Sequence, residues 1–278
     1  MSTRFANIQE PSGTGDGRVD LQWDGRGIAS LIINRPRRRN CLTHEMSSTI
    51  LSGLLAAEED PAVRVVVLRG AGGGFCSGDD VGTVDRWRAG DRSDAPFDHV
   101  TSDAHYLRIC EAIVSMPKPV VAVLEGAAAG AGAEIACAAD YRFCSSGVRI
   151  GSCLVLVGHV GNMAMMSRVV GPARATEIYL TGRLVDAEEA LAIGLVDRVV
   201  PDDSFDAELE AFLERLATAP TRSIGLFKEL RERSWGQSAQ HALRLQDAYH
   251  LRTHREVQDG AEGLRAFVER RPPRFTGQ

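Results

Sequence analysis

The sequence predicts an α/β fold followed by an all-helical C-terminal region. Apolar strands alternate with helical segments up to about residue 200, and strand signals stop after Pro201. The chain has 278 residues, of which 44% are hydrophobic and 25% charged, so it can bury a large core and differs from disordered or collagen-like chains. We expect one large domain, or one domain with a smaller appendage.

The N-terminal part begins with a polar tail and a hairpin. Residues 1–17 are too polar to pack and are predicted to form a flexible tail. Residues 19–23 and 28–34 flank an Asp-Gly-Arg-Gly turn, a pattern typical of a β-hairpin. The folded core is expected to span residues 18–200.

The core alternates between short apolar strands and helices with apolar spacing. Strands are expected at residues 63–69, 120–124, 141–143, 148–150 and 196–200, and helices at residues 46–59, 131–137, 173–180 and 187–193. Residues 82–102 are polar and charged without an apolar period, which predicts a loop that is functional or disordered. The region 201–278 carries helical segments at residues 205–217, 223–232, 239–254 and 260–270.

Composition excludes several classes of protein. The net charge of −5 gives no reason to expect a nucleic-acid partner. No apolar run reaches the length of a membrane span or a signal-peptide core, so we expect a cytoplasmic protein without a membrane partner. The six cysteines lie mostly in apolar stretches without a CxxC pair, which indicates buried reduced thiols and no metal site.

A glycine- and alanine-rich segment, residues 126–140, follows a buried strand and opens a helix. Small residues let a ligand approach the backbone, and free N–H groups at a helix start favour negative charge. A dinucleotide-binding fingerprint does not match, because Ile135 stands where the third glycine would be. Close helix packing without a ligand is the alternative.

A second glycine cluster, residues 70–80, also follows a buried strand. Two such turns could face each other across one crevice and each offer a backbone N–H group. Two donors of this kind form an oxyanion hole.

Several motifs in a fixed order make the chain similar to the crotonase superfamily, whose best-known members are enoyl-CoA hydratases and isomerases. The match runs from about residue 18 to the C-terminus. The motifs are Asn34-Arg35-Pro36 with Asn40, residues 75–80, residues 126–140, residues 168–171, Thr181-Gly182 with residues 187–200, and residues 262–267 with Arg271-Pro272 and Phe275. The resemblance implies a crotonase-like spiral of ββα turns, a C-terminal helical trimerisation region at residues 201–278, and a homotrimer or dimer of trimers.

The resemblance also implies positions for the oxyanion donors and the CoA contacts. The two donors fall on the backbone N–H groups of Asp79 and Ala131, which would polarise the thioester carbonyl of an acyl-CoA. Asp79 stands where the family has a small residue, and capping of the following helix is an equally weighted interpretation of its side chain. Contacts to CoA are expected from Arg38, Arg39, Cys76, Gly78 and Gly130.

Glu134 matches one of the two catalytic carboxylates of the hydratases. It follows Ala131 by three residues and shares its helix face, which would place it near the carbons next to the thioester. A lone glutamate in such an apolar run is costly to bury, so an acid–base or substrate-contact role is favoured over a structural hydrogen bond.

The second carboxylate is missing, because Leu154 occupies its position. Asp79, His159 and Asn162 are possible substitutes. For His159 the alternative is a hydrogen-bonded loop residue. Hydration across a double bond is therefore less expected than reactions that need one acid–base group or none.

Other polar residues are weaker candidates. Trp87, His99 and His105 could line the acyl pocket or could simply pack. His250 and His254 have metal-ligand spacing but no third ligand, so a helix surface is favoured. The basic residues Arg37, Arg270, Arg271 and Arg274 could contact CoA phosphates, in part across subunits.

The predicted function is that of a crotonase-family enzyme of fatty acid metabolism that stabilises the enolate of an acyl-CoA. Isomerisation, decarboxylation or C–C cleavage is favoured over hydration, with Glu134 as the main acid–base group. No cofactor is expected beyond the CoA moiety of the substrate. The alternatives are an acyl-CoA-binding homologue without catalysis and, more remotely, a nicotinamide-dependent reductase.

Overall fold

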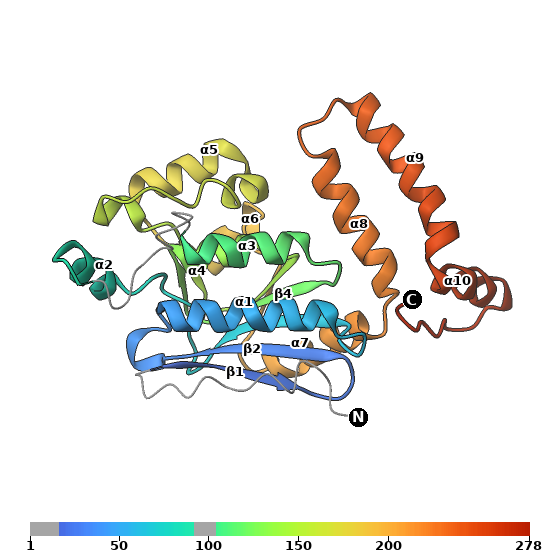
Figure 1. Cartoon of the computed structure of the whole chain (residues 1–278), viewed down its shortest axis with the longest axis horizontal. Helices are drawn as coiled ribbons and strands as arrows, with labels where there is room; N and C mark the ends of the chain where they lie inside the picture. The colour runs from blue at the N-terminus through green and yellow to red at the C-terminus, as the bar shows by residue number, and fades with distance from the viewer. Residues whose placement is uncertain (1–16, 92–103) are drawn as a thin grey trace.

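The computed structural model describes residues 17–91 and 104–278, and a six-stranded sheet forms its centre (Figure 1). The strand order is β1-β2-β3-β4-β6-β9; β1 runs antiparallel to β2, and all other neighbours are parallel. Most of the predicted tail, residues 1–16, lies outside the described residues. The strands are β1 (Arg18–Trp23), β2 (Ile28–Asn34), β3 (Val65–Gly70), β4 (Val120–Leu124), β6 (Tyr141–Ser145) and β9 (Arg198–Val200).

Helices cover both faces of this sheet, which is why β3 and β4 are continuous apolar runs. On one face lie α1 (His44–Glu59), α3 (His105–Ser115) and α4 (Ala131–Ala138), which share the main hydrophobic core. On the other face lies α7 (Phe205–Ala217), whose Phe212 stacks on Phe143 of β6 while Phe205 meets the same ring edge-on.

A second, three-stranded sheet brings the two glycine-rich segments together. It consists of β5 (Ala127–Ala129), β7 (Arg149–Gly151) and β8 (Val185–Asp186), in the order β5-β7-β8. An isolated parallel bridge joins Cys76 to Ala128, so the turn after β3 lies directly beside β5. The two glycine-rich segments are thereby fixed next to each other.

The predicted loop at residues 82–102 begins instead as a helix, α2 (Val81–Arg88). Its first turn is capped by Asp80, whose carboxylate accepts a hydrogen bond from the Gly82 N–H at 3.0 Å. The helix lacks a core-facing apolar stripe because its apolar side chains line an open pocket, described below. Residues 92–103 lie outside the described part of the chain.

Helix α5 (Met166–Thr181) also begins earlier than predicted. Gly171 has non-helical angles, φ 77° and ψ 161°, and Pro172 follows it, so two helical pieces meet at a kink. The predicted segment 173–180 is the second piece. Three shorter elements are η2 (Pro36–Arg38), η3 (Leu154–Val157) and α6 (Ala187–Ala192).

The last three helices extend away from the sheets (Figure 1). They are α8 (Thr221–Ser234), α9 (Ala239–Glu256) and α10 (Gln258–Glu269). The buried Lys228 ties α8 to the core, because its ammonium donates to the carbonyls of Ile113 and Lys118 and pairs with Asp140. Within the described ranges, no helix has the length and apolar character needed to cross a membrane.

Candidate active site

The turns that follow β3 and β5 meet in backbone contact. The Cys76 N–H donates to the Ala127 carbonyl at 3.0 Å, and the Ala129 N–H donates to the Cys76 carbonyl at 2.9 Å. Gly78 has φ 100°, and a Cβ at this position would lie 3.1 Å from the Ala129 oxygen and 3.2 Å from the Ala131 nitrogen. Only glycine therefore allows this approach.

Two backbone N–H groups at this junction are available to a ligand. Ala131 is the first residue of α4, so its N–H has no acceptor within the helix. The bridge between Leu42 and Asp79 uses the Gly78 carbonyl and the Asp80 N–H, at 2.8 and 3.0 Å. Because successive peptide groups of an extended chain point to opposite sides, the Asp79 N–H faces away from this bridge.

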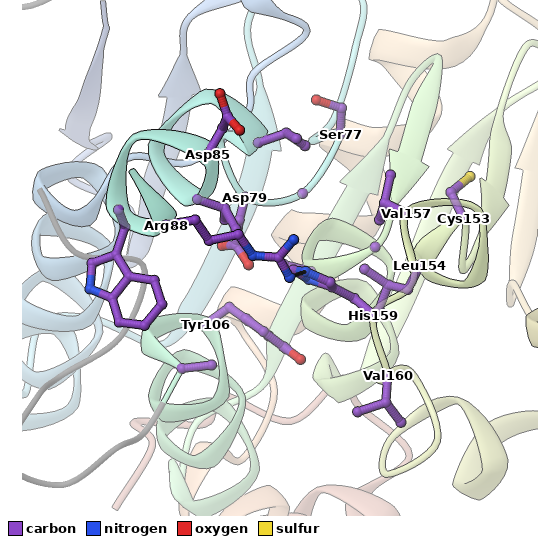
Figure 2. Close-up of a pocket in the computed structure, with 17 residues that line it drawn as sticks. Ser77, Asp79, Asp85, Arg88, Tyr106, Cys153, Leu154, Val157, His159 and Val160 are labelled. Carbon is purple, nitrogen blue, oxygen red and sulfur yellow. Dashed lines mark hydrogen bonds between the residues drawn. The ribbon is translucent and has the colours of Figure 1, made fainter. Parts of the chain in front are cut away.

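A pocket of about 460 Å³ opens at the junction (Figure 2). Its backbone floor includes residues 77–79, Gly130 and Ala131. Its polar side chains are Ser77, Asp79, Asp85, Arg88, Tyr106 and His159. The remaining lining is mainly apolar: Val81, Val84, Trp87, Ala104, Cys153, Leu154, Val157 and Val160.

Asp79 places a carboxyl group in this pocket. Its exposed surface faces the pocket, while protein encloses it on the other sides, and this burial raises its pKa to about 6. Within the described residues no hydrogen bond to this carboxylate is found. The alternative of Asp79 as a helix cap is wrong: the cap is Asp80, which also pairs with Arg35 at 2.8 Å.

Glu134 has a different environment. It is 1% exposed and is not among the residues that line the pocket. Its carboxylate accepts hydrogen bonds from the Met165 N–H at 3.0 Å and from the Asn162 amide at 3.3 Å. Burial raises its pKa, and these hydrogen bonds oppose the rise. The side chain thus holds the loop before α5.

Asn162 links Glu134 to the glycine turn. Its amide donates to the Gly130 carbonyl at 2.7 Å, and its side-chain oxygen accepts from the Ser152 hydroxyl at 2.9 Å. Asn162 is buried, adopts a left-handed φ of 61° and does not line the pocket. It supports the position of Gly130 and hence of the Ala131 donor.

His159 lies in the pocket and contacts an arginine that the sequence analysis did not single out. The Arg88 guanidinium extends across the pocket to His159, with Nη2 3.4 Å from Nε2 (Figure 2). Tyr106 is a second lining residue missed from the sequence; burial, then the charges of Asp79 and Glu134, raise its pKa. The sequence analysis predicted no helix over residues 105–115, so nothing in the sequence pattern singled out this side chain.

The predicted CoA contacts fall on three kinds of position. Arg38 and Arg39 are exposed on the η2 turn, and the Ser77 N–H donates to the Arg39 carbonyl at 3.1 Å, so this basic turn lies beside the pocket. Gly78 and Gly130 line the pocket. Cys76 is fully buried outside the lining, with a thiol pKa raised to about 12 by burial, and it contributes through its backbone.

The weaker candidates lie at separate places in the structure. Trp87 lines the pocket, and His99 lies outside the described residues. His105 contacts His44, with ring nitrogens 2.6 Å apart.

His250 and His254 face each other on the exposed side of α9, and the described ranges contain no group of three or more His, Cys, Asp or Glu suited to a metal ion. In the C-terminal basic group (Arg270, Arg271 and Arg274), Arg271 pairs with Glu262.

A sequence profile described as "Enoyl-CoA hydratase/isomerase" matches residues 24–278. The chain belongs to the enoyl-CoA hydratase/isomerase family. This confirms the crotonase resemblance. Structures confirm the fold: an enoyl-CoA hydratase from Bacillus anthracis superimposes with a TM-score of 0.82 at 26% identity, covering 94% of this chain and 99% of that one.

Relatives in the family differ in their reactions. The 1,2-epoxyphenylacetyl-CoA isomerase of Escherichia coli K12 is 32% identical over 256 residues, which are 91% of this chain and 96% of that protein. The trans-2-decenoyl-[acyl-carrier-protein] isomerase of Streptococcus mutans is 32% identical over 260 residues, 91% of this chain and 95% of that protein. The (E)-benzylidenesuccinyl-CoA hydratase of Thauera aromatica is 31% identical over 263 residues, 90% of this chain and 96% of that protein. The family alone therefore does not assign the reaction.

Proposed function

We propose that this member of the family converts an acyl-CoA thioester through an enolate. The thioester oxygen would accept hydrogen bonds from the Asp79 and Ala131 N–H groups, which stabilise the negative charge that develops when a bond at the α-carbon breaks. The convergence of these two donors on one pocket supports the proposal. A crotonase homologue that only binds acyl-CoA is the competing function.

The proposed reaction is double-bond isomerisation or C–C cleavage, including decarboxylation, rather than hydration. The observation that carries this choice is that Leu154 lines the pocket. By the family resemblance, Leu154 occupies the position of the second glutamate of the hydratases. Hydration needs one group to activate water and another to serve the α-carbon. Isomerisation needs one group that takes a proton from one carbon and returns it to another.

We assign this proton transfer to the Asp79 carboxyl. It lines the pocket beside one of the oxyanion donors, and a pKa of about 6 suits a group that must accept and release a proton near neutral pH. The sequence favoured Glu134 for this role. Its hydrogen bonds to Met165 and Asn162, and its position outside the pocket lining, support a positioning role instead.

Turnover of a panel of CoA thioesters, followed by mass spectrometry, tests the proposed function. The panel contains 2-enoyl, 3-enoyl, β-keto and carboxylated acyl groups, so that isomerisation, cleavage, decarboxylation and hydration are scored together. We expect isomerised or cleaved products and little hydration of crotonyl-CoA. Efficient hydration would contradict the choice of reaction, and binding without any product would favour the non-catalytic homologue.

We also propose a homotrimer or a dimer of trimers. The helices after α7 leave large apolar side chains in solvent, including Phe267 and Val268 of α10, which are 84% and 79% exposed. Light scattering at micromolar concentration should give three or six times the monomer mass of 30.0 kDa. A monomer would contradict the assembly.

A further inference from the structure

One cation lies among the residues that line the pocket. Of the described lining residues, Arg88 is the single arginine, and none is a lysine. The Arg88 side chain is exposed, and apolar side chains of α2 and of residues 154–160 share the lining with it. An anion that enters the pocket from solvent can therefore reach the guanidinium directly.

Among the described residues, Arg88 has no carboxylate partner. Its contact is His159 Nε2 at 3.4 Å, and in this contact the guanidinium can act only as a donor. No carboxylate in the described part of the chain lies within 4.0 Å of its nitrogens. By contrast, Arg86 on the same helix pairs with Asp91 and donates to Thr83. Arg88 therefore keeps donors for a ligand in the pocket.

His159 gives this arginine a fixed neighbour. The backbone N–H of His159 donates to the Leu154 carbonyl at 3.0 Å, and the backbone carbonyl of His159 accepts from the Tyr179 hydroxyl at 2.9 Å. The loop is thus tied both to η3 and to α5. Arg88 approaches it from α2, on the opposite part of the lining (Figure 2).

We propose that Arg88, seated against His159, binds a carboxylate carried by the acyl group of the substrate. A planar guanidinium matches a carboxylate with two parallel hydrogen bonds, which an ester, ketone or alkyl chain does not reproduce. The substrates would then be CoA thioesters of acids with a second carboxyl group. This inference rests on the proposed acyl-CoA function and names its substrate class.

Equilibrium binding of matched thioesters tests the inference. Pentanoyl-CoA and glutaryl-CoA, and hexanoyl-CoA and adipyl-CoA, have equal chain lengths and differ in the terminal carboxylate. By isothermal titration calorimetry, the wild type should bind the carboxylated member of each pair about 10-fold or more tightly, which corresponds to ~1.4 kcal/mol. Arg88→Gln should remove this preference, and Arg88→Lys should keep part of it.

Arg86→Gln is the matched control, because Arg86 lies on the same helix outside the pocket lining and should leave the preference intact. Thermal unfolding of each variant checks the fold. Equal binding of both members by the wild type, or a preference that survives Arg88→Gln, would overturn the carboxylate site and leave the acyl-CoA function standing. Failure of the wild type to bind any CoA thioester would overturn both.

Discussion

The turns after β3 and β5 are built alike and use their carboxyl groups differently. Each joins a strand to a helix through glycine, and residues of both turns line the same pocket. The Asp79 carboxylate of the first turn faces the pocket and has no hydrogen bond among the described residues. The Glu134 carboxylate of the second is buried and receives hydrogen bonds from the loop before α5.

This difference indicates a reactive role for one carboxylate and a structural role for the other. An ionised carboxylate without hydrogen-bond donors is destabilising where it is enclosed, which is typical of a group kept for reaction. A buried carboxylate with backbone and amide donors is satisfied and fixes the chain around it. In this account Asp79 reacts, and Glu134 with Asn162 holds the Gly130 turn.

The largest expected effect is on turnover. Asp79→Asn keeps the shape and removes the proton transfer, so turnover of the true substrate should fall about 10²- to 10⁴-fold. For Glu134→Gln we expect a loss below about 10-fold, because only the support of the loop is weakened.

In the wild type kcat/KM should rise with pH through about 6, as the Asp79 carboxyl loses its proton, and level off above. Steady-state assays between pH 4.5 and 8.5 measure all three.

The next effect is on stability and has opposite signs at the two positions. The Asp79 pKa is raised from near 4 to about 6, so the folded state holds that proton more tightly and the ionised carboxylate costs up to about 3 kcal/mol above pH 6. Asp79→Asn should therefore raise the free energy of unfolding at pH 7.5, with the gain shrinking as pH falls from 6 to 4. Urea unfolding of the wild type and the variant at pH 7.5 and at pH 4 measures this gain. An equal gain at both pH values would contradict the pKa argument.

Glu134→Gln should lower the free energy of unfolding by about 1–2 kcal/mol, because the new amide group opposes the Asn162 amide and leaves a donor without an acceptor. The same urea series compares the two variants. Stabilisation by Glu134→Gln together with destabilisation by Asp79→Asn would reverse the comparison.

A smaller effect is expected where the turn after β3 meets the basic η2 turn. Loss of the charges in Arg38→Ala/Arg39→Ala should weaken CoA binding about 10-fold and reduce its sensitivity to salt, because contacts between arginine and phosphate are screened by ions. Arg26→Ala is the control, since Arg26 lies at the other end of β2 and pairs with Asp24 and Glu210. Calorimetry at 50 and 300 mM salt measures the affinities; unchanged binding in the double variant would remove this turn from the site.

The smallest effect is a gain. Leu154→Glu introduces a carboxyl group into the pocket lining, at the position that the family resemblance gives to the second glutamate of the hydratases. Hydration of crotonyl-CoA should rise a few-fold above the wild type, measured by the loss of the ultraviolet absorbance of the enoyl thioester. A wild type that already hydrates crotonyl-CoA efficiently would show that Leu154 does not set the reaction.

Much of the fold could be predicted from the sequence, because the buried parallel strands are unbroken apolar runs and the hairpin has its turn residues. Helix α2 could not, since its apolar side chains face a pocket and give no core-facing period. The capping of α2 by Asp80 rather than Asp79 was equally hidden, because two adjacent aspartates carry the same local signal.

The site was predictable where it depends on backbone and not where it depends on side-chain direction. Glycine clusters after two buried strands indicated that two turns could face one crevice, and the family resemblance implied donors at Asp79 and Ala131. The contacts of Glu134 with Asn162 and Met165, and of Arg88 with His159, join segments about 28 to 71 residues apart in the chain. No local pattern encodes them.

Exchange of α-protons with solvent tests the central claim most directly, because it needs no knowledge of the true substrate. Butyryl-CoA is incubated with each protein in D₂O, and deuterium at the α-carbon is followed by mass spectrometry. We expect exchange with the wild type, a rate within about 10-fold for Glu134→Gln, and at least 10²-fold slower exchange for Asp79→Asn with thioester binding intact. Exchange that survives in Asp79→Asn and is lost in Glu134→Gln would contradict the account.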